Sequence, residues 1–183
     1  MVTDPAFSML RFVGAAVAVV LGIACSSSAP SDLPQDPPRD PPRACTQIAC
    51  EDGLKLDLEP SSGWPAGDYR FLIGSDDVRV TCRGSLPLPA CSAGRSVTCE
   101  PAVVTVVESG CALPASAHGF PQISFDPMLR PKSVRVSIVR SQGGVDSEVA
   151  SAELSPEFRT VEPNGPGCPP VCTQAQGRVP VRF

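Results

Sequence analysis

Clustered basic residues are what this chain most conspicuously lacks, and the lack excludes one large class of partner. The 183 residues include 15 Lys and Arg against 19 Asp and Glu, for a formal net charge of −4, and the cations are scattered. A nucleic-acid-binding surface needs clustered cations to neutralise phosphates. The sequence therefore predicts no nucleic-acid partner. It also contains no polybasic segment that would hold the chain on an anionic membrane surface.

Residue types that carry catalysis are equally scarce. Histidine occurs once, at His118, and no serine lies in a Gly-x-Ser-x-Gly pattern that would mark a nucleophile. Carboxylate pairs could form among six acids, but sequence gives no distance between their carboxyl groups: Glu51, Asp52, Asp57, Glu59, Asp76 and Asp77. The last two follow Gly-Ser and fit a turn better than a calcium loop. We interpret His118 as a loop histidine and predict no enzymatic activity, cofactor or metal.

Long apolar runs and helical periodicity are also missing. The longest apolar stretch, Phe12 to Ala24, has 13 residues, whereas a membrane-spanning helix needs about 20. No segment repeats its apolar residues with a period of 3.6, and Gly or Pro interrupts almost every ten residues. Helix is therefore expected to be a minor element.

The short apolar stretch instead has the features of an export signal. Arg11 precedes it, and small residues lead into Cys25. The segment resembles the lipobox of bacterial lipoproteins, carried here by Leu21, Gly22, Ile23 and Ala24 before Cys25. The resemblance implies removal of residues 1–24 and diacylation of Cys25. Translation starting at Met9 would give a more compact signal. Since no aspartate follows Cys25, the resemblance also implies an outer-membrane destination.

Residues 25–44 have the composition of a tether. Prolines occur at positions 30, 34, 37, 38, 41 and 42, among Ser and Asp. Proline fixes φ and removes amide donors, so an extended polyproline II spacer of at most roughly 60 Å is expected. A proline-rich ligand for another domain is the alternative, but spacers are far commoner.

Cysteine is abundant. Nine cysteines less Cys25 leave an even eight, which in an exported chain predicts four disulfides: Cys45, Cys50, Cys82, Cys91, Cys99, Cys111, Cys168 and Cys172. The first two and the last two of these cysteines lie at the two ends of the domain. Either each pair forms a local disulfide, or the two pairs bond to each other as a clasp. The middle four are expected to staple one hairpin region. Structural zinc is the alternative, disfavoured because an oxidising compartment does not preserve thiolates.

Apolar residues alternate with polar ones after Cys45. This period of two predicts strands at 54–58, 69–73, 78–82, 123–125, 134–138, 145–154 and 158–161, with a hairpin turn at Gly143-Gly144. The nearly continuous apolar run 103–107 suggests a central strand buried on both sides. The fold class is thus all-β: a disulfide-stapled antiparallel β-sandwich of immunoglobulin-like or transthyretin-like outline over residues 45–175. Residues 176–183 could be a last strand or a tail.

Two loops offer candidate contact residues. Trp64, the only tryptophan, could contact a protein or sugar if exposed, although a tryptophan more often plugs the end of a sandwich. Leu86 and Leu88, in the loop 84–91, could form an exposed apolar contact or a flap of the core. These features predict a non-enzymatic, lipid-anchored envelope protein that presents a binding or structural module to an unknown protein or carbohydrate. The alternative is an enzyme inhibitor acting through loop 84–91, or, less favoured, a hydrolase.

Overall fold

The computed structural model describes residues 44–76 and 78–183, and every structural statement below concerns that part of the chain. The predicted signal, Cys25 and nearly all of the predicted tether lie outside the described residues, as does Asp77. Across the described part, no helix has the length and apolar character needed to cross a membrane.

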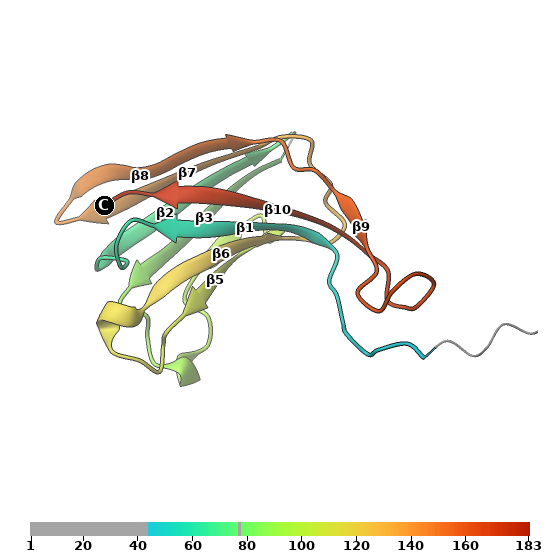
Figure 1. The fold of residues 1–183 in the computed structure, drawn as a ribbon. Coiled ribbons are helices and arrows are strands. Elements are labelled where there is room, and N and C mark those ends of the chain that lie inside the picture. Colours follow the sequence, from blue (N-terminus) through green and yellow to red (C-terminus); the bar gives the residue numbers. More distant parts are fainter. Residues whose placement is uncertain (1–43, 77) are drawn as a thin grey trace, which may run out of the picture. The chain divides into compact units, whose positions relative to one another are not determined.

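Ten strands form two five-stranded sheets (Figure 1). Sheet A has the order β5-β6-β1-β10-β9, and sheet B has the order β4-β3-β2-β7-β8. The only helices in the described segments are two 3-10 turns, Cys91–Ala93 and Ala115–Ala117. The strands are β1 (Gly53–Pro60), β2 (Gly67–Ser75), β3 (Val78–Leu86), β4 (Thr98–Glu100), β5 (Val104–Ser109), β6 (Gly119–Phe125), β7 (Val134–Gln142), β8 (Val145–Leu154), β9 (Arg159–Val161) and β10 (Cys172–Val181). The predicted all-β, sandwich-like fold is confirmed.

The core lies between the sheets and follows directly from the period of two. In β2, Tyr69, Phe71 and Ile73 are 2%, 0% and 2% exposed, whereas Arg70 and Leu72 point away from the core. Side chains of successive strand residues point to opposite faces, so each strand contributes one apolar row. Burial of these rows is the main stabilising term for the fold.

The hairpin between β7 and β8 forms as the sequence predicts. Gly143 and Gly144 have φ angles of 58° and 81°, the positive values that a two-residue hairpin turn requires. Further along, the register shifts between Ile138 and Val139. This bulge turns two consecutive residues of β8, Val149 and Ala150, toward the core.

The strand β5 differs from its prediction. Its β-branched run suggested a central strand, but β5 is an edge strand of sheet A and pairs only with β6. Val104 and Val106 are buried, whereas Thr105 and Val107 are half-buried on the other face. A β-branched run indicates strand structure but does not say how many neighbours the strand has.

One strand pair is parallel. β10 runs beside β1 with Gly53 opposite Gln174 and Pro60 opposite Val181, so residues 176–181, which the sequence could not assign, belong to a strand. Val179 and Val181 are almost fully buried. All other strand pairs in the two sheets are antiparallel.

All eight cysteines expected to pair do so, in four disulfides. Cys45–Cys168 and Cys50–Cys172 join positions 123 and 122 residues apart, so the outer cysteines form a clasp rather than local rings. Cys82–Cys99 joins directly opposite residues of β3 and β4, and Cys91–Cys111 joins the loops after β3 and β5. Four disulfides indicate an oxidising, extracytoplasmic location.

Hydrogen bonds from one side chain reinforce the clasp. The Asn164 carboxamide oxygen accepts from the Ile48 amide at 2.8 Å and from the Thr46 hydroxyl at 2.5 Å. Its nitrogen donates to the carbonyl oxygens of Ile48 and Pro169 at 3.0 and 2.6 Å. Residues 45–50 are therefore fixed to the 164–172 segment by both covalent and hydrogen bonds.

Candidate functional site

Trp64 plugs one end of the sandwich. It is 9% exposed and makes edge-to-face contacts with Tyr69, Phe120 and Phe183 at centroid distances of 5.4, 5.2 and 5.5 Å. The ring lies so close to the backbone of Gly119 that a Cβ there would stand 2.5 Å from the Trp64 Cδ1 atom. The residue is thus part of the core, as expected for a tryptophan that plugs the end of a sandwich, and the alternative of an exposed contact is wrong.

Leu86 and Leu88 are also core residues. Their exposed fractions are 5% and 7%. Leu86 is the last residue of β3 and shares its buried face with Val80 and Cys82, and Leu88 follows just after the strand. Pro87, Pro89 and Ala90 carry the exposed side of this loop. The expectation of an exposed apolar contact at Leu86 and Leu88 is therefore wrong, and the alternative of a core flap is confirmed.

His118 holds that flap in place. Its Nδ1 accepts a hydrogen bond from the Leu88 amide at 2.9 Å, which assigns the proton to Nε2, and Nε2 donates to the Leu113 carbonyl oxygen at 2.9 Å. The side chain is buried and both ring nitrogens are used by the backbone. This arrangement agrees with the interpretation of His118 as a structural loop residue.

The five candidate acids that the structure describes each contact different partners. Asp52 accepts from the Thr173 amide at 2.6 Å, and Asp76 accepts from the amides of Lys132 and Ser133 at 3.1 and 3.2 Å. The other three described acids contact Lys55, Gln122 and Arg178: Glu51, Asp57 and Glu59. The Lys55 ammonium lowers the pKa of the Glu51 carboxyl through a hydrogen bond and its charge. These contacts support turns and strand pairs rather than an acid-base pair.

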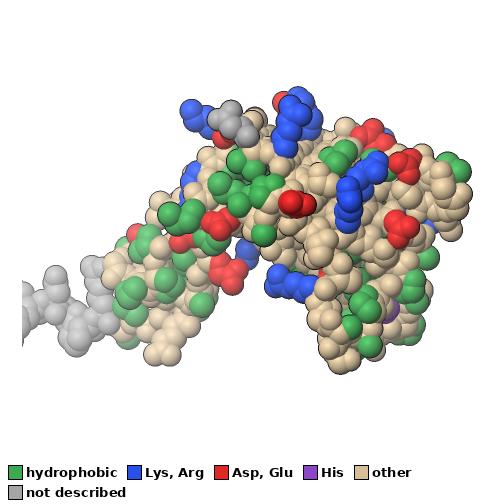
Figure 2. Space-filling model, turned by 180° about the vertical axis from the view of Figure 1, so that it is seen from behind, with side chains coloured by type: hydrophobic (Ala, Val, Ile, Leu, Met, Phe, Trp, Pro, Cys, Tyr) green, Lys and Arg blue, Asp and Glu red, His purple; other side chains and the backbone are tan. Residues whose placement is uncertain are grey.

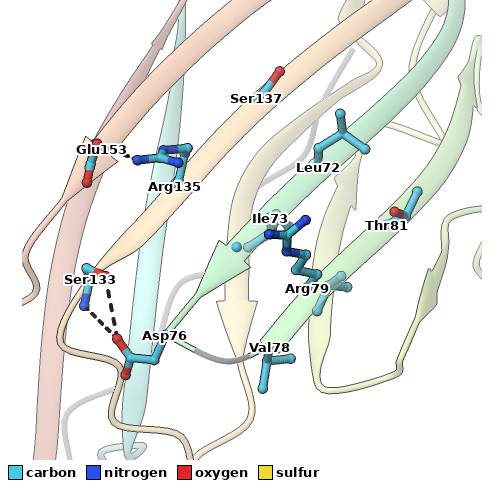
Figure 3. Close-up of a pocket in the computed structure, with 12 residues that line it drawn as sticks. Leu72, Ile73, Asp76, Val78, Arg79, Thr81, Ser133, Arg135, Ser137 and Glu153 are labelled. Carbon is cyan, nitrogen blue, oxygen red and sulfur yellow. Dashed lines mark hydrogen bonds and ion pairs between the residues drawn. The ribbon is translucent and has the colours of Figure 1, made fainter.

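A hollow that sequence reasoning did not identify lies on the outer face of sheet B (Figure 3). It has a volume of about 530 Å³ and is built on two rows of cross-strand neighbours. In one row Gly74 of β2 lies between Arg79 of β3 and Arg135 of β7. Gly74 has no side chain, and no atom lies within 4 Å of where its Cβ would stand. The surface is therefore recessed at Gly74, between the two arginines.

The second row provides an apolar floor with hydroxyl groups on both sides. Leu72 of β2 lies between Thr81 of β3 and Ser137 of β7 and is 39% exposed, which is unusual for a leucine in the middle of a sheet. The hollow thus combines one apolar side chain, two hydroxyls and two guanidinium groups. Such a mixture can hold a ligand that has both apolar and polar or anionic parts.

The arginines on this face differ in their partners. Arg135 pairs with Glu153 at 3.0 Å, and Arg70, in the next row, pairs with Asp146 at 3.2 Å. The hydrogen bond from Ser141 is the main cause that lowers the pKa of Asp146, with a smaller contribution from Arg70. Arg79 and Arg83, both on β3, have no ion-pair partner within residues 44–76 and 78–183. These two guanidinium groups are available to a ligand.

The sequence contains only part of the information needed to predict this hollow. Alternation places Arg79 and Thr81 opposite the buried Val80, so their outward orientation could be predicted. The order of the strands could not be, and it is this order that brings β7 next to β2 and Arg135 opposite Gly74. The chain matches no protein-family model, and searches of curated proteins and of solved structures find no match either.

Proposed function

We propose that this protein is a non-enzymatic, lipid-anchored protein of the bacterial cell envelope, whose β-sandwich serves as a tethered binding module. The acyl chains would be attached to Cys25, and residues 26–44 would hold the sandwich away from an outer membrane. The observation that supports this most is the clasp, because it lies where the tether would enter the domain.

The clasp suits a domain held by one end. A force on residue 44 would reach Cys45 and Cys50 first, and both are bonded to the segment that leads into β10. The load would pass through disulfides before it reached the hydrogen bonds between β1 and β10. The disulfides would thus protect the β1–β10 pairing whenever the tether is under load.

Mass and location of the full chain test the proposal. In the bacterial host, the protein should begin at Cys25, carry added acyl mass, sediment with the outer membrane and release eight thiols only after reduction. Cys25→Ala should lack the acyl mass, keep residues 1–24 because cleavage follows lipidation of the cysteine, and be lost from the outer-membrane fraction, whereas the neighbouring change Ser26→Ala should do none of these. Retention of residues 1–24 in the unchanged protein, or a Cys25→Ala variant that is still cleaved and still sediments with the outer membrane, would contradict lipid anchoring.

No observation favours the two alternatives. An inhibitor needs a side chain that enters the cleft of its target, and Leu86 and Leu88 are buried in the core instead. A hydrolase needs a base that can reach substrate, and both nitrogens of His118 are bonded to the backbone.

A further inference from the structure

Three hollows follow one another along the outer face of β3. The first is the hollow around Leu72 and Gly74 described above. The second, of about 500 Å³, is lined by Thr81, Arg83 and β4. The third, of about 400 Å³, lies around Arg70, Arg83 and Ser85. β3 has nine residues, so this track, defined by the three hollows, is about 30 Å long.

Charges of both signs line the track, with Asp76 and Glu153 in the first hollow, Glu100 in the second and Asp68 in the third. Arg135 and Arg70 are paired with acids, whereas Arg79 and Arg83 have no ion-pair partner among the described residues. Arg79 and Arg83 point outward with Thr81 between them, which places their Cα atoms about 13 Å apart. Glu100, on β4, lies directly opposite Thr81 and lines the second hollow. An anionic group is therefore favoured near each arginine and disfavoured between them.

Hydroxyl groups occupy most of the remaining positions. Thr81 and Ser137 lie in the first hollow, and four more line the third: Ser85, Ser96, Thr98 and Ser141. Four of these hydroxyls already donate to carboxylates, and their oxygens can still accept from a ligand: Ser85 to Asp68, Ser96 to Glu108, Ser137 to Glu148 and Ser141 to Asp146. Figure 2, the view from behind Figure 1, shows Lys or Arg and acidic side chains at separate places among hydrophobic and uncharged surface. Such a surface is suited to a ligand rich in hydroxyl groups.

The backbone of β2, at the centre of this face, is not available to a ligand, because β2 is paired on both edges with β3 and β7. β3 is paired with β4 over Thr81–Arg83 alone, and β4 is an edge strand of sheet B. An extended peptide gains most of its affinity from main-chain hydrogen bonds at a free edge. A ligand that lies across the face, rather than along the β4 edge, must instead be recognised by side chains.

We propose that the track binds a linear acidic glycan whose carboxylates are separated by neutral sugars. One carboxylate would contact Arg79 and the next Arg83, with neutral sugars over Thr81 and Glu100. The apolar face of one ring would rest on Leu72, above the gap left by Gly74. This inference rests on the proposed function as a binding module and names its ligand class.

Titration of the detergent-extracted full chain with hyaluronan octasaccharide tests the assignment, because its carboxylates alternate with neutral sugars. Calorimetry should detect binding that weakens as salt is raised, and the methyl ester of the same octasaccharide should bind about tenfold more weakly or worse. The double variant Arg79→Gln/Arg83→Gln should lose about tenfold or more in affinity.

The matched control removes the same charge elsewhere. Arg178 and Arg182 are exposed and belong to β10 or follow it directly, so Arg178→Gln/Arg182→Gln should leave affinity unchanged. Equal loss in both double variants would show nonspecific attraction and overturn the proposal, as would absence of binding. Equally tight binding of an acidic peptide with the same number of carboxylates would overturn the glycan in favour of a peptide. Each of these results is independent of Cys25 acylation, so a failure here is distinguishable from a failure of lipid anchoring.

Discussion

His118 shows how a residue that invites a catalytic interpretation can be wholly structural. Its imidazole Nδ1 accepts the hydrogen bond of the buried Leu88 amide at 2.9 Å. We predict that His118→Ala lowers the free energy of unfolding by about 1–3 kcal/mol, because the amide loses its partner inside the protein. Urea unfolding followed by the fluorescence of Trp64, the single tryptophan, measures this change. The exposed neighbour Ser116→Ala is the control, and an equal effect in both variants would contradict the role given to the imidazole.

Tyr69 gives the fold a specific sensitivity to alkali. Burial raises the pKa of its phenol from 10.0 to about 12, although the nearby Arg140 acts in the opposite direction. Since the folded pKa is the higher one, the stabilising contribution is complete below pH 10 and is lost as pH rises toward about 12.

The chain has one tyrosine, so phenolate absorbance reports this group alone. We expect its midpoint near the raised value in the folded protein and near the ordinary value in urea. In Tyr69→Phe, the free energy of unfolding should become less dependent on pH across this interval. The variant should also be about 1 kcal/mol less stable at neutral pH, because the 2.6 Å hydrogen bond to the Pro65 carbonyl is lost. A folded-state midpoint at the ordinary value would contradict the effect of burial.

At the scale of elements, alternation was enough to locate most strands but not to arrange them. The runs at 69–73 and 134–138 are amphipathic over several residues, and both fall within observed strands. β4 has three residues and is too short to show a pattern; its place is fixed by pairing with β3 and by Cys82–Cys99.

β10 was ambiguous for a physical reason. It contains Gly177 and Pro180, both of which argue against a strand. β9 pairs only with Cys172–Gln174, so the remainder of that edge of β10 has no strand partner and a proline is tolerated there. At Gly177 a Cβ would stand 2.8 Å from Leu56 and 2.9 Å from Leu154, so the glycine leaves room for core packing between the sheets.

At the scale of the whole molecule, the two clasp disulfides are expected to act non-additively. While one clasp disulfide remains, the other closes only a small additional ring of the unfolded chain. Replacing both cysteines of either disulfide with alanine should therefore lower the free energy of unfolding by about 3 kcal/mol. Removing both opens the long loop as well and should cost about 8 kcal/mol, more than twice the single effect.

Urea unfolding of the variants Cys45→Ala/Cys168→Ala, Cys50→Ala/Cys172→Ala and the quadruple variant measures this difference. Cys91→Ala/Cys111→Ala, which opens a loop with a sequence separation of 20, is the control for loss of a disulfide outside the clasp. Strict additivity of the two clasp pairs would show that they do not close a common loop.

The parallel pairing of β1 with β10 also determines the order in which this protein can fold. Sheet A has β1 and β10 at its centre, and their partners lie more than one hundred residues apart, as with Gly53 and Gln174. A chain that emerges gradually from a narrow channel can form the β2-β3 and β7-β8 hairpins early, because their contacts are local. It cannot complete sheet A until β10 has emerged. Because of this high contact order, the domain stays incompletely folded while the chain passes through the channel. It finishes folding only after β10 has left the channel.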